Sequence, residues 1–208
     1  MLEINQLSAA REGRTLFECL SFRLNAGEVL QIAGRNGSGK TTLLRMVAGL
    51  ARQDQGEVYW NREKVSSSRE AYHSNLLFIG HQTGIKKELT AYENLRFLLS
   101  AHANYNHSKQ DLYFALMKVG LVGREDVAVA HLSAGQQRRV ALARLWLSRQ
   151  PLWILDEPLT AIDKQGVKVL EQVFLRHASE GGMVMLTTHQ DIFLNHDSLR
   201  TITLGDKQ

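Results

Sequence analysis

Apolar and polar positions recur with two different periods along the first fifty residues. Residues 3–7 and 20–24 alternate with period two, which is typical of strands that bury one face. Residues 28–33 are mostly apolar and end at a glycine-rich segment, as a buried strand followed by a turn does. Apolar residues between 41 and 50 then recur at helical spacing. The start of the chain therefore predicts short strands, a glycine-rich turn and a helix.

The pattern is helical again between residues 88 and 121. Apolar side chains there form two helical faces, with Leu89, Tyr92, Leu95 and Leu99 on one and Leu112, Ala115, Leu116 and Val119 on the other. Two later runs, 152–155 and 183–186, are continuously apolar, as parallel strands covered on both faces are. We expect an α/β body with a small helical lobe inserted in it.

Length and composition narrow the class of protein. A chain of 208 residues suits one domain, and 44% hydrophobic with 22% charged residues excludes a disordered, collagen-like or coiled-coil chain. The net charge of +4 is compatible with an anionic ligand or a membrane surface and selects neither. Cys19, the single cysteine, excludes a disulfide framework and a cysteine-rich metal site, and we expect its thiol to be buried.

Targeting and membrane-spanning patterns are missing from the sequence. The first residues lack the basic and then apolar run of a signal peptide, and no stretch of about 18 uncharged apolar residues occurs. We therefore expect a protein of the cytosol, or one that a partner holds at a membrane.

Residues 34–41, Gly-Arg-Asn-Gly-Ser-Gly-Lys-Thr, fit the pattern G-x-x-x-x-G-K-[ST] between a predicted strand and a predicted helix. Glycines let the backbone aim its N–H groups at phosphate oxygens, and the helix points its positive end at them. Lys40 places a cation against the β- and γ-phosphates, and Thr41 offers a hydroxyl to Mg²⁺. An ordinary strand-to-helix turn does not need the lysine. The residues expected to bind nucleotide here are Gly34, Arg35, Asn36, Gly37, Ser38, Gly39, Lys40, Thr41 and Thr42.

Two acids, Asp156 and Glu157, follow the apolar run 152–155. A buried carboxylate is costly unless a cation lies near it. Asp156 therefore suits a Mg²⁺ ligand acting through water, and Glu157 suits a general base that polarises the attacking water. Many apolar strands end in acids, but together with the phosphate-binding loop this pair indicates a nucleoside triphosphatase.

A third motif spans residues 132–144, Leu-Ser-Ala-Gly-Gln-Gln-Arg-Arg-Val-Ala-Leu-Ala-Arg. Ser133 is a good helix N-cap, and Ala134 and Gly135 leave backbone N–H groups open for an anion. A capped amphipathic helix with a basic face accounts for the arginines of this motif. It does not account for the short interval between the serine cap and the two acids.

Taken together, the three motifs make the chain similar to the ATP-binding subunits of ABC transporters along essentially its whole length. The resemblance implies that residues 34–41 form the Walker A loop and residues 152–156 the Walker B strand, with Glu157 as the catalytic carboxylate. Residues 132–136 match the family signature sequence, although Ala134 stands where the family usually has glycine.

The same resemblance implies roles for residues in three loops. Gln82 corresponds to the glutamine that senses Mg²⁺ and couples to the membrane partner, Asp163 to the loop acid at the dimer contact, and His189 to the histidine that contacts the γ-phosphate. The implied catalytic residues are Glu157, His189, Gln82 and Lys40, the implied Mg²⁺ ligands are Thr41, Gln82 and Asp156, and the further nucleotide contacts are Ser133, Gly135, Gln136 and Asp163.

For the architecture, the resemblance implies an α/β P-loop nucleoside triphosphatase core of the ABC ATPase type, with an antiparallel β lobe and an inserted helical subdomain. Residues 1–208 would form one ATP-binding domain, with the helical subdomain at about 86–131. Two copies would pair head to tail, with ATP between the phosphate loop of one copy and Ser133 of the other. ATP binding would close this dimer and hydrolysis would open it, driving an integral membrane permease. No nucleic-acid partner is expected.

The contact to adenine departs from the family pattern. The position where the family usually stacks an aromatic ring on the base holds Arg11. A guanidinium stacks on a base as well. Phe17 or a main-chain contact is the alternative, so the residue that holds adenine stays open.

Two stretches, residues 79–95 and 141–163, are similar to the ATPase subunit of the cytochrome c maturation transporter, often called a haem exporter. This resemblance implies a peripheral protein at the cytoplasmic face of the inner membrane that takes part in c-type cytochrome biogenesis. Whether haem is moved, another compound is moved, or only a conformational change in a maturation complex is driven stays open.

Other functions compete with this interpretation. One is an ABC ATPase for another small-solute or lipid transporter, a second is an ABC ATPase of DNA repair or translation, and a third is a nucleotide-binding scaffold. The segment between Lys40 and Ser133 leaves no room for the long coiled coil of repair members, and translation members carry two such domains in one chain. The presence of Glu157 and His189 argues against an inactive site.

Overall fold

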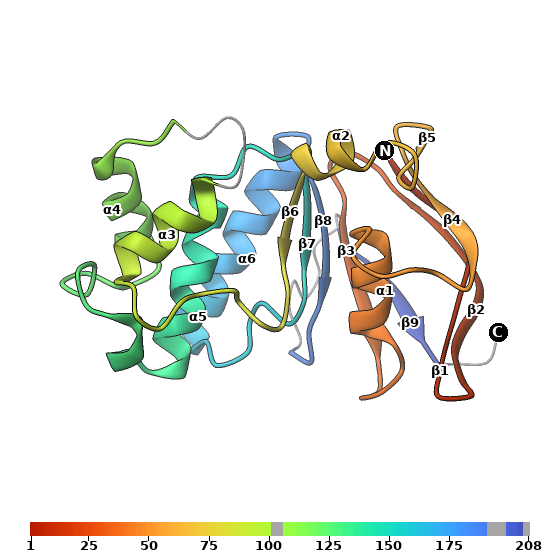
Figure 1. The fold of residues 1–208 in the computed structure, drawn as a ribbon, viewed down its shortest axis with the longest axis horizontal. Helices are drawn as coiled ribbons and strands as arrows, with labels where there is room; N and C mark the ends of the chain where they lie inside the picture. The colour runs from red at the N-terminus through yellow and green to blue at the C-terminus, as the bar shows by residue number, and fades with distance from the viewer. Residues whose placement is uncertain (101–105, 191–198, 206–208) are drawn as a thin grey trace. The chain divides into compact units, whose positions relative to one another are not determined.

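A computed structural model of the chain describes residues 1–100, 106–190 and 199–205 (Figure 1). The chain divides into two compact units. The first unit comprises Met1–His81, Gln150–Pro158 and Phe174–Gln208, and the second comprises Gln82–Arg149 and Leu159–Val173. The expectation of a single ATP-binding domain over residues 1–208, with a helical subdomain at about 86–131, stays a prediction.

An antiparallel sheet forms one part of the first unit. Its strand order is β2-β1-β4-β5, with β1 Leu2–Arg11, β2 Arg14–Leu24, β4 Gln55–Trp60 and β5 Glu63–Lys64. The strands predicted at residues 3–7 and 20–24 lie inside β1 and β2, which are longer because bulges shift their register and let pairing continue. The two-residue period holds on each side of the bulge in β1, where Leu2 and Ile4 are buried before it and Leu7 and Ala9 after it.

A five-stranded parallel sheet forms the other part of the first unit. Its strand order is β6-β7-β8-β3-β9, with β3 Val29–Gly34, β6 Leu76–Ile79, β7 Leu152–Leu155, β8 Met183–Thr187 and β9 Leu199–Leu204. β8 pairs in parallel with both β3 and β7. The segments that follow these three strands therefore meet at one edge of the sheet, which is where open parallel sheets hold their ligands.

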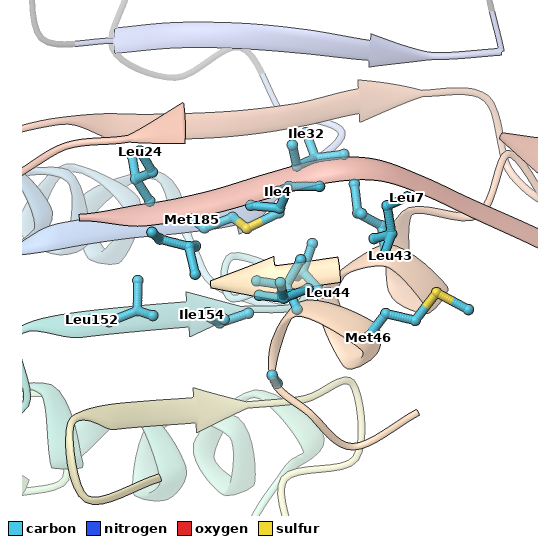
Figure 2. Close-up of a cluster of buried hydrophobic side chains, with 14 of the residues drawn as sticks. Ile4, Leu7, Leu24, Ile32, Leu43, Leu44, Met46, Leu152, Ile154 and Met185 are labelled. Atoms are coloured by element: carbon cyan, nitrogen blue, oxygen red, sulfur yellow. The ribbon is translucent and has the colours of Figure 1, made fainter. Parts of the chain in front are cut away.

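The core of the first unit lies among the two sheets and helix α1, Lys40–Val47. Figure 2 shows Ile4 and Leu7 of β1 converging with Leu43 and Leu44 of α1 and with side chains of the parallel sheet. These residues are almost completely buried. Packing on both sides of α1 fixes the helix that follows the glycine-rich loop, and so fixes the loop itself. A short helix, α2, spans Arg69–Ser74.

Helices dominate the second unit. It contains α3 (Ala91–Ser100), α4 (Lys109–Lys118), α5 (Ala134–Leu142), the short 3₁₀ turns η1 (Val129–His131) and η2 (Ala143–Trp146), and the first ten residues of α6, which spans Lys164–Ser179. The two apolar faces predicted between 88 and 121 are confirmed, because their residues pack into one core with α5. Residues 101–105 of that predicted helical stretch lie outside the described residues.

The expectation of a buried thiol at Cys19 is wrong, since the side chain is exposed. Cys19 lies where β1 and β2 shift register, with a φ of 49°, and the irregularity leaves it facing outward. None of the helices in the described part of the chain combines the length and the apolar character that crossing a bilayer requires.

Candidate functional site

The glycine-rich loop connects β3 to α1. Gly39 forms the N-cap of α1 with a φ of 96°, which is a left-handed conformation that glycine adopts without strain. A Cβ at this position would stand 2.9 Å from the Cβ of Leu16 in β2. Because Gly39 has no side chain, the loop passes close to β2, and the backbone N–H groups at the start of α1 stay open toward an anion.

Lys40 is held by the loop itself. Its Nζ donates to the carbonyl oxygen of Gly34 at 2.8 Å and to that of Arg35 at 3.3 Å, and the side chain is only 8% exposed. The ammonium group therefore lies within the loop rather than in solvent. A phosphate in this loop would meet a cation that is already positioned.

Asp156 lies directly after β7 and is 1% exposed. Its Oδ1 accepts a hydrogen bond from the Thr41 hydroxyl at 3.2 Å and another from the Thr187 hydroxyl at 2.8 Å. Thr41 lies in the first turn of α1, Asp156 follows β7, and Thr187 is the last residue of β8. The strand order brings these side chains together, although Thr41 and Thr187 are more than a hundred residues apart in the sequence.

Glu157 has an unusual backbone conformation, with a φ of 51°. A residue with a side chain is strained there by about 1–3 kcal/mol, and such strain gathers at functional sites. The backbone N–H of Glu157 donates to the Thr187 hydroxyl at 2.8 Å, which helps to hold this conformation. The carboxylate Oε1 lies 3.4 Å from Nε2 of His189. The turn after β7 thus presents the carboxylate to a histidine from the segment after β8.

The oxygen atoms of Thr41 and Asp156 fit a magnesium ion. Mg²⁺ prefers hard oxygen ligands and is usually held by one or two carboxylates together with substrate phosphates. Among the described residues, no cluster of three or more histidine, cysteine or acidic side chains forms a complete metal cage. One carboxylate and one hydroxyl suit a Mg²⁺ ion that is held together with substrate phosphates.

Ser133 caps α5 in the second unit. Its hydroxyl accepts from the N–H of Gln136 at 3.2 Å, and the Gln136 side-chain oxygen accepts from the N–H of Ser133 at 3.0 Å, which completes a capping box. The N–H groups of Ala134 and Gly135 have no acceptor among the described residues, as expected for the first turn of a helix. This helix start therefore offers two N–H groups to an anion.

Gly135 packs directly against the loop that carries Asp163. A Cβ on Gly135 would stand 2.6 Å from the carbonyl oxygen of Ala161, so only glycine allows this contact. Asp163 accepts from the N–H of Gly166 at 2.8 Å and forms an ion pair with Arg139 of α5. The hydrogen bond from Gly166, together with the charge of Arg139, lowers the pKa of Asp163.

The predicted site residues therefore fall into two groups. The first unit brings together the phosphate loop, Lys40, Thr41, Asp156, Glu157 and His189. In the second unit Ser133, Gly135 and Gln136 start α5, Asp163 lies against the same helix, and Gln82 is exposed in the loop before α3. The roles given to these residues stay predictions.

The two candidates for the adenine contact differ in exposure. Phe17 is 8% exposed, and its ring would lie 3.3 Å from a Cβ on Gly39, so it packs beneath the phosphate loop. Arg11 ends β1, and its side chain is exposed beside Glu12. Arg11 is therefore the more accessible of the two to a base.

Sequence reasoning missed Thr187. The residue lies in the polar segment after the predicted strand 183–186, and its hydroxyl bonds to both Asp156 and Glu157. The polar run Thr187-Thr188-His189 after a buried strand was the available signal.

The sequence is compatible with an exposed basic face made by the arginines of the third motif. In the structure, however, Arg138 and Arg144 are buried. Burial lowers the pKa of Arg144 to about 10.

Comparison with known proteins places these features in a family. The sequence profile described as "ABC transporter" matches residues 17–160. The chain is 65% identical over 206 residues to the Cytochrome c biogenesis ATP-binding export protein CcmA of Vibrio cholerae, which covers 99% of both chains. It is 54% identical to the protein of the same name from Yersinia pestis, over all of this chain and 94% of the relative.

Solved structures have the same fold. A putative ABC transporter ATP-binding protein from Pyrococcus furiosus is 25% identical with a TM-score of 0.83, over 98% of this chain and 96% of that one. The ATP-binding cassette MJ0796, solved as a dimer with ADP and Pi, has a TM-score of 0.83 at 24% identity over 98% of this chain and 94% of that one. The predicted P-loop core with its antiparallel and parallel sheets is confirmed. The chain belongs to the ABC transporter family and is an ATP-binding, ATP-hydrolysing member of it.

Proposed function

We propose that this chain is the motor subunit of a transporter that serves c-type cytochrome biogenesis. It hydrolyses ATP on the cytoplasmic face of the inner membrane and drives a separate integral membrane permease. The 65% identity to CcmA over nearly the whole chain supports the biological role. The hydrogen-bonded arrangement of Thr41, Asp156, Thr187 and Glu157 supports the chemistry and is the observation on which the mechanism rests.

Binding of the triphosphate uses the phosphate loop. The open N–H groups at the start of α1 donate to phosphate oxygens, and Lys40 exchanges its carbonyl partners for the β- and γ-phosphates. Thr41 and Asp156 are the residues of the first unit that hold Mg²⁺. When bound, the ion neutralises charge that develops on the β- and γ-phosphates. Arg11 stacks on the adenine ring.

Hydrolysis uses Glu157 as the general base. A water molecule attacks the γ-phosphorus, its proton passes to the Glu157 carboxylate, and the bond from the γ-phosphorus to the β-phosphate oxygen breaks to release ADP and phosphate. Thr187 keeps the Glu157 backbone in its strained turn and so aims the carboxylate. His189, 3.4 Å from that carboxylate, contacts the γ-phosphate.

A second copy of the chain completes the site. The N–H groups of Ala134 and Gly135, which find no acceptor in the described part of the chain, offer an anion-binding helix start in addition to the first copy's phosphate loop. We place the γ-phosphate between the loop of one copy and the Ser133 turn of the other. Asp163 lies at the contact between the copies. Closing and opening of this pair transmits work to the permease.

The dependence of ATPase activity on protein concentration tests the shared site. Specific activity of the purified chain should rise with concentration until the dimer dominates, because a dilute monomer has only half of each site. Dilution into carrier albumin controls for loss on surfaces. A specific activity that stays constant over the whole dilution series would contradict the shared site.

Genetic complementation tests the biological role separately. In a bacterium that lacks its own CcmA, this chain should restore covalently haem-bearing c-type cytochromes, detected by haem staining of a denaturing gel. The Lys40→Met variant should not restore them, because it lacks the cation that meets the phosphates. Normal ATPase activity with no restored cytochromes would point to a transporter for another solute.

A further inference from the structure

A pocket of about 320 Å³ lies within the second unit, whereas the phosphate loop belongs to the first unit. The C-terminal end of α4, the second half of α5 with η2, and the first turns of α6 form its walls. Its volume is at the lower end of the range for small-molecule sites, which is about 300–1,000 Å³. The space therefore suits a compact ligand of two or three aromatic rings, or an alkyl chain of medium length.

The walls of this pocket are mainly apolar. Leu142, Trp146, Ile162, Val169 and Leu170 supply most of the lining. Val169 is 37% exposed, and Trp146 is only partly buried. These side chains stay accessible to a ligand that has an apolar body, and their contact with it would remove apolar surface from water.

Charge at the pocket is positive. Lys118 and Arg139 are cations, and Asp163 is the one anion among the lining residues, all of which the structure describes. Arg139 is fixed by its ion pair with Asp163 and by a 3.5 Å hydrogen bond to the carbonyl oxygen of Val119. Lys118 is exposed at the end of α4. The net positive charge favours a ligand that carries a negative group.

We propose that this pocket is a binding site for small amphipathic anions, such as aryl sulfonates or medium-chain carboxylates. The apolar body lies against Trp146 and Val169, and the anionic group faces Lys118. This inference goes beyond the proposed function and does not depend on it, since the pocket is formed by one unit of one chain and its test needs no nucleotide.

Fluorescence titration with 8-anilinonaphthalene-1-sulfonate tests the proposal on the full chain without nucleotide. Saturable binding at one site per chain is expected. Val169→Trp fills the pocket and should weaken binding at least about tenfold. Val122→Trp is the matched control, because Val122 is also an exposed valine of the second unit, 69% exposed, and does not line the pocket. It should bind the probe as the unmodified chain does.

Lys118→Gln tests the charge and is safe for folding, because the side chain is exposed. Binding of the sulfonate should weaken about two- to fivefold, the range of an exposed charge pair. Binding of the neutral N-phenyl-1-naphthylamine should not change. Circular dichroism checks that each variant is folded. The proposal is overturned if the probe fails to saturate, if Val169→Trp and Val122→Trp bind alike, or if Lys118→Gln affects both probes equally.

Discussion

Thr187 links the carboxylate of Asp156 to the backbone of Glu157 through one hydroxyl group. The hydroxyl donates to Asp156 Oδ1 and accepts from the backbone N–H of Glu157, both at 2.8 Å. The side chain is completely buried, so neither bond competes with water. Thr187 is a positioning residue, because it acts on ATP and the metal only through its two acidic neighbours.

Replacing Thr187 by valine should lower kcat about 10- to 100-fold, as loss of a supporting partner in such sites does. The reason is that Asp156 and Glu157 lose the group that orients them. Thr187→Ser keeps the hydroxyl and should restore most of the activity. Steady-state kinetics at varied Mg²⁺ check the result, and an increased Mg²⁺ requirement is expected for the valine variant only. Equal activity of the two variants would show that the hydroxyl has no such role.

Glu157→Gln should reduce kcat by about 10²–10⁴, the contribution of a general base. Binding of ATP should change little, because the phosphate loop and Lys40 are unaltered. Phosphate release measures the first quantity and filter binding of labelled ATP the second. Hydrolysis at the normal rate would mean that another group takes the proton from water.

At the scale of the elements, the sequence predicted best those helices and strands whose own residues carry a clear pattern. Strand β7, helix α1 and the capping box of α5 follow from apolar runs, glycines and a serine cap. Among the described residues, the helices and strands that the sequence analysis did not predict are α2, α6, β4, β5, β6 and β9. The sequence patterns of these segments are short or mixed. The segments form helices and strands because neighbouring elements pair with them or cover them.

Helix α6 also brings His177 onto β7. The imidazole stacks on Trp153 with ring centroids 3.7 Å apart and an interplanar angle of 6°. Gly182 fits beneath it, since a Cβ there would stand 2.2 Å from Nε2. Burial lowers the pKa of His177, while the carbonyl of Pro151 and the charge of Glu180 oppose this shift. The folded protein therefore favours the neutral ring.

This shift predicts a pH dependence of stability. The unfolded chain takes up a proton at His177 near pH 6.5 and the folded chain only at lower pH, so the free energy of unfolding should fall as pH drops below 6.5. His177→Phe keeps a ring on Trp153 and should lose this part of the dependence. Urea unfolding at several pH values gives the difference between the two proteins. A difference that does not vary with pH would contradict the assignment.

For the whole molecule, the sequence motifs identified residues of the site but did not show how these residues are arranged in space. The phosphate loop, Asp156 and Glu157 were found because each follows an apolar strand. Their meeting with Thr187 and His189 depends on the strand order, in which β8 lies between β3 and β7. No local pattern encodes that order. The pocket bounded by α4, α5 and α6 was hidden for the same reason, since its lining comes from separate segments.

The shared ATP site is the central claim, and sedimentation velocity of Glu157→Gln tests it most directly. With Mg²⁺ and ATP this variant should sediment as a dimer, because it binds ATP and hydrolyses it slowly. Adding Ser133→Arg should return it to a monomer that still binds ATP, since the arginine blocks only the second copy's helix start. A monomer of Glu157→Gln with ATP bound, or a dimer that persists with Ser133→Arg, would contradict the account.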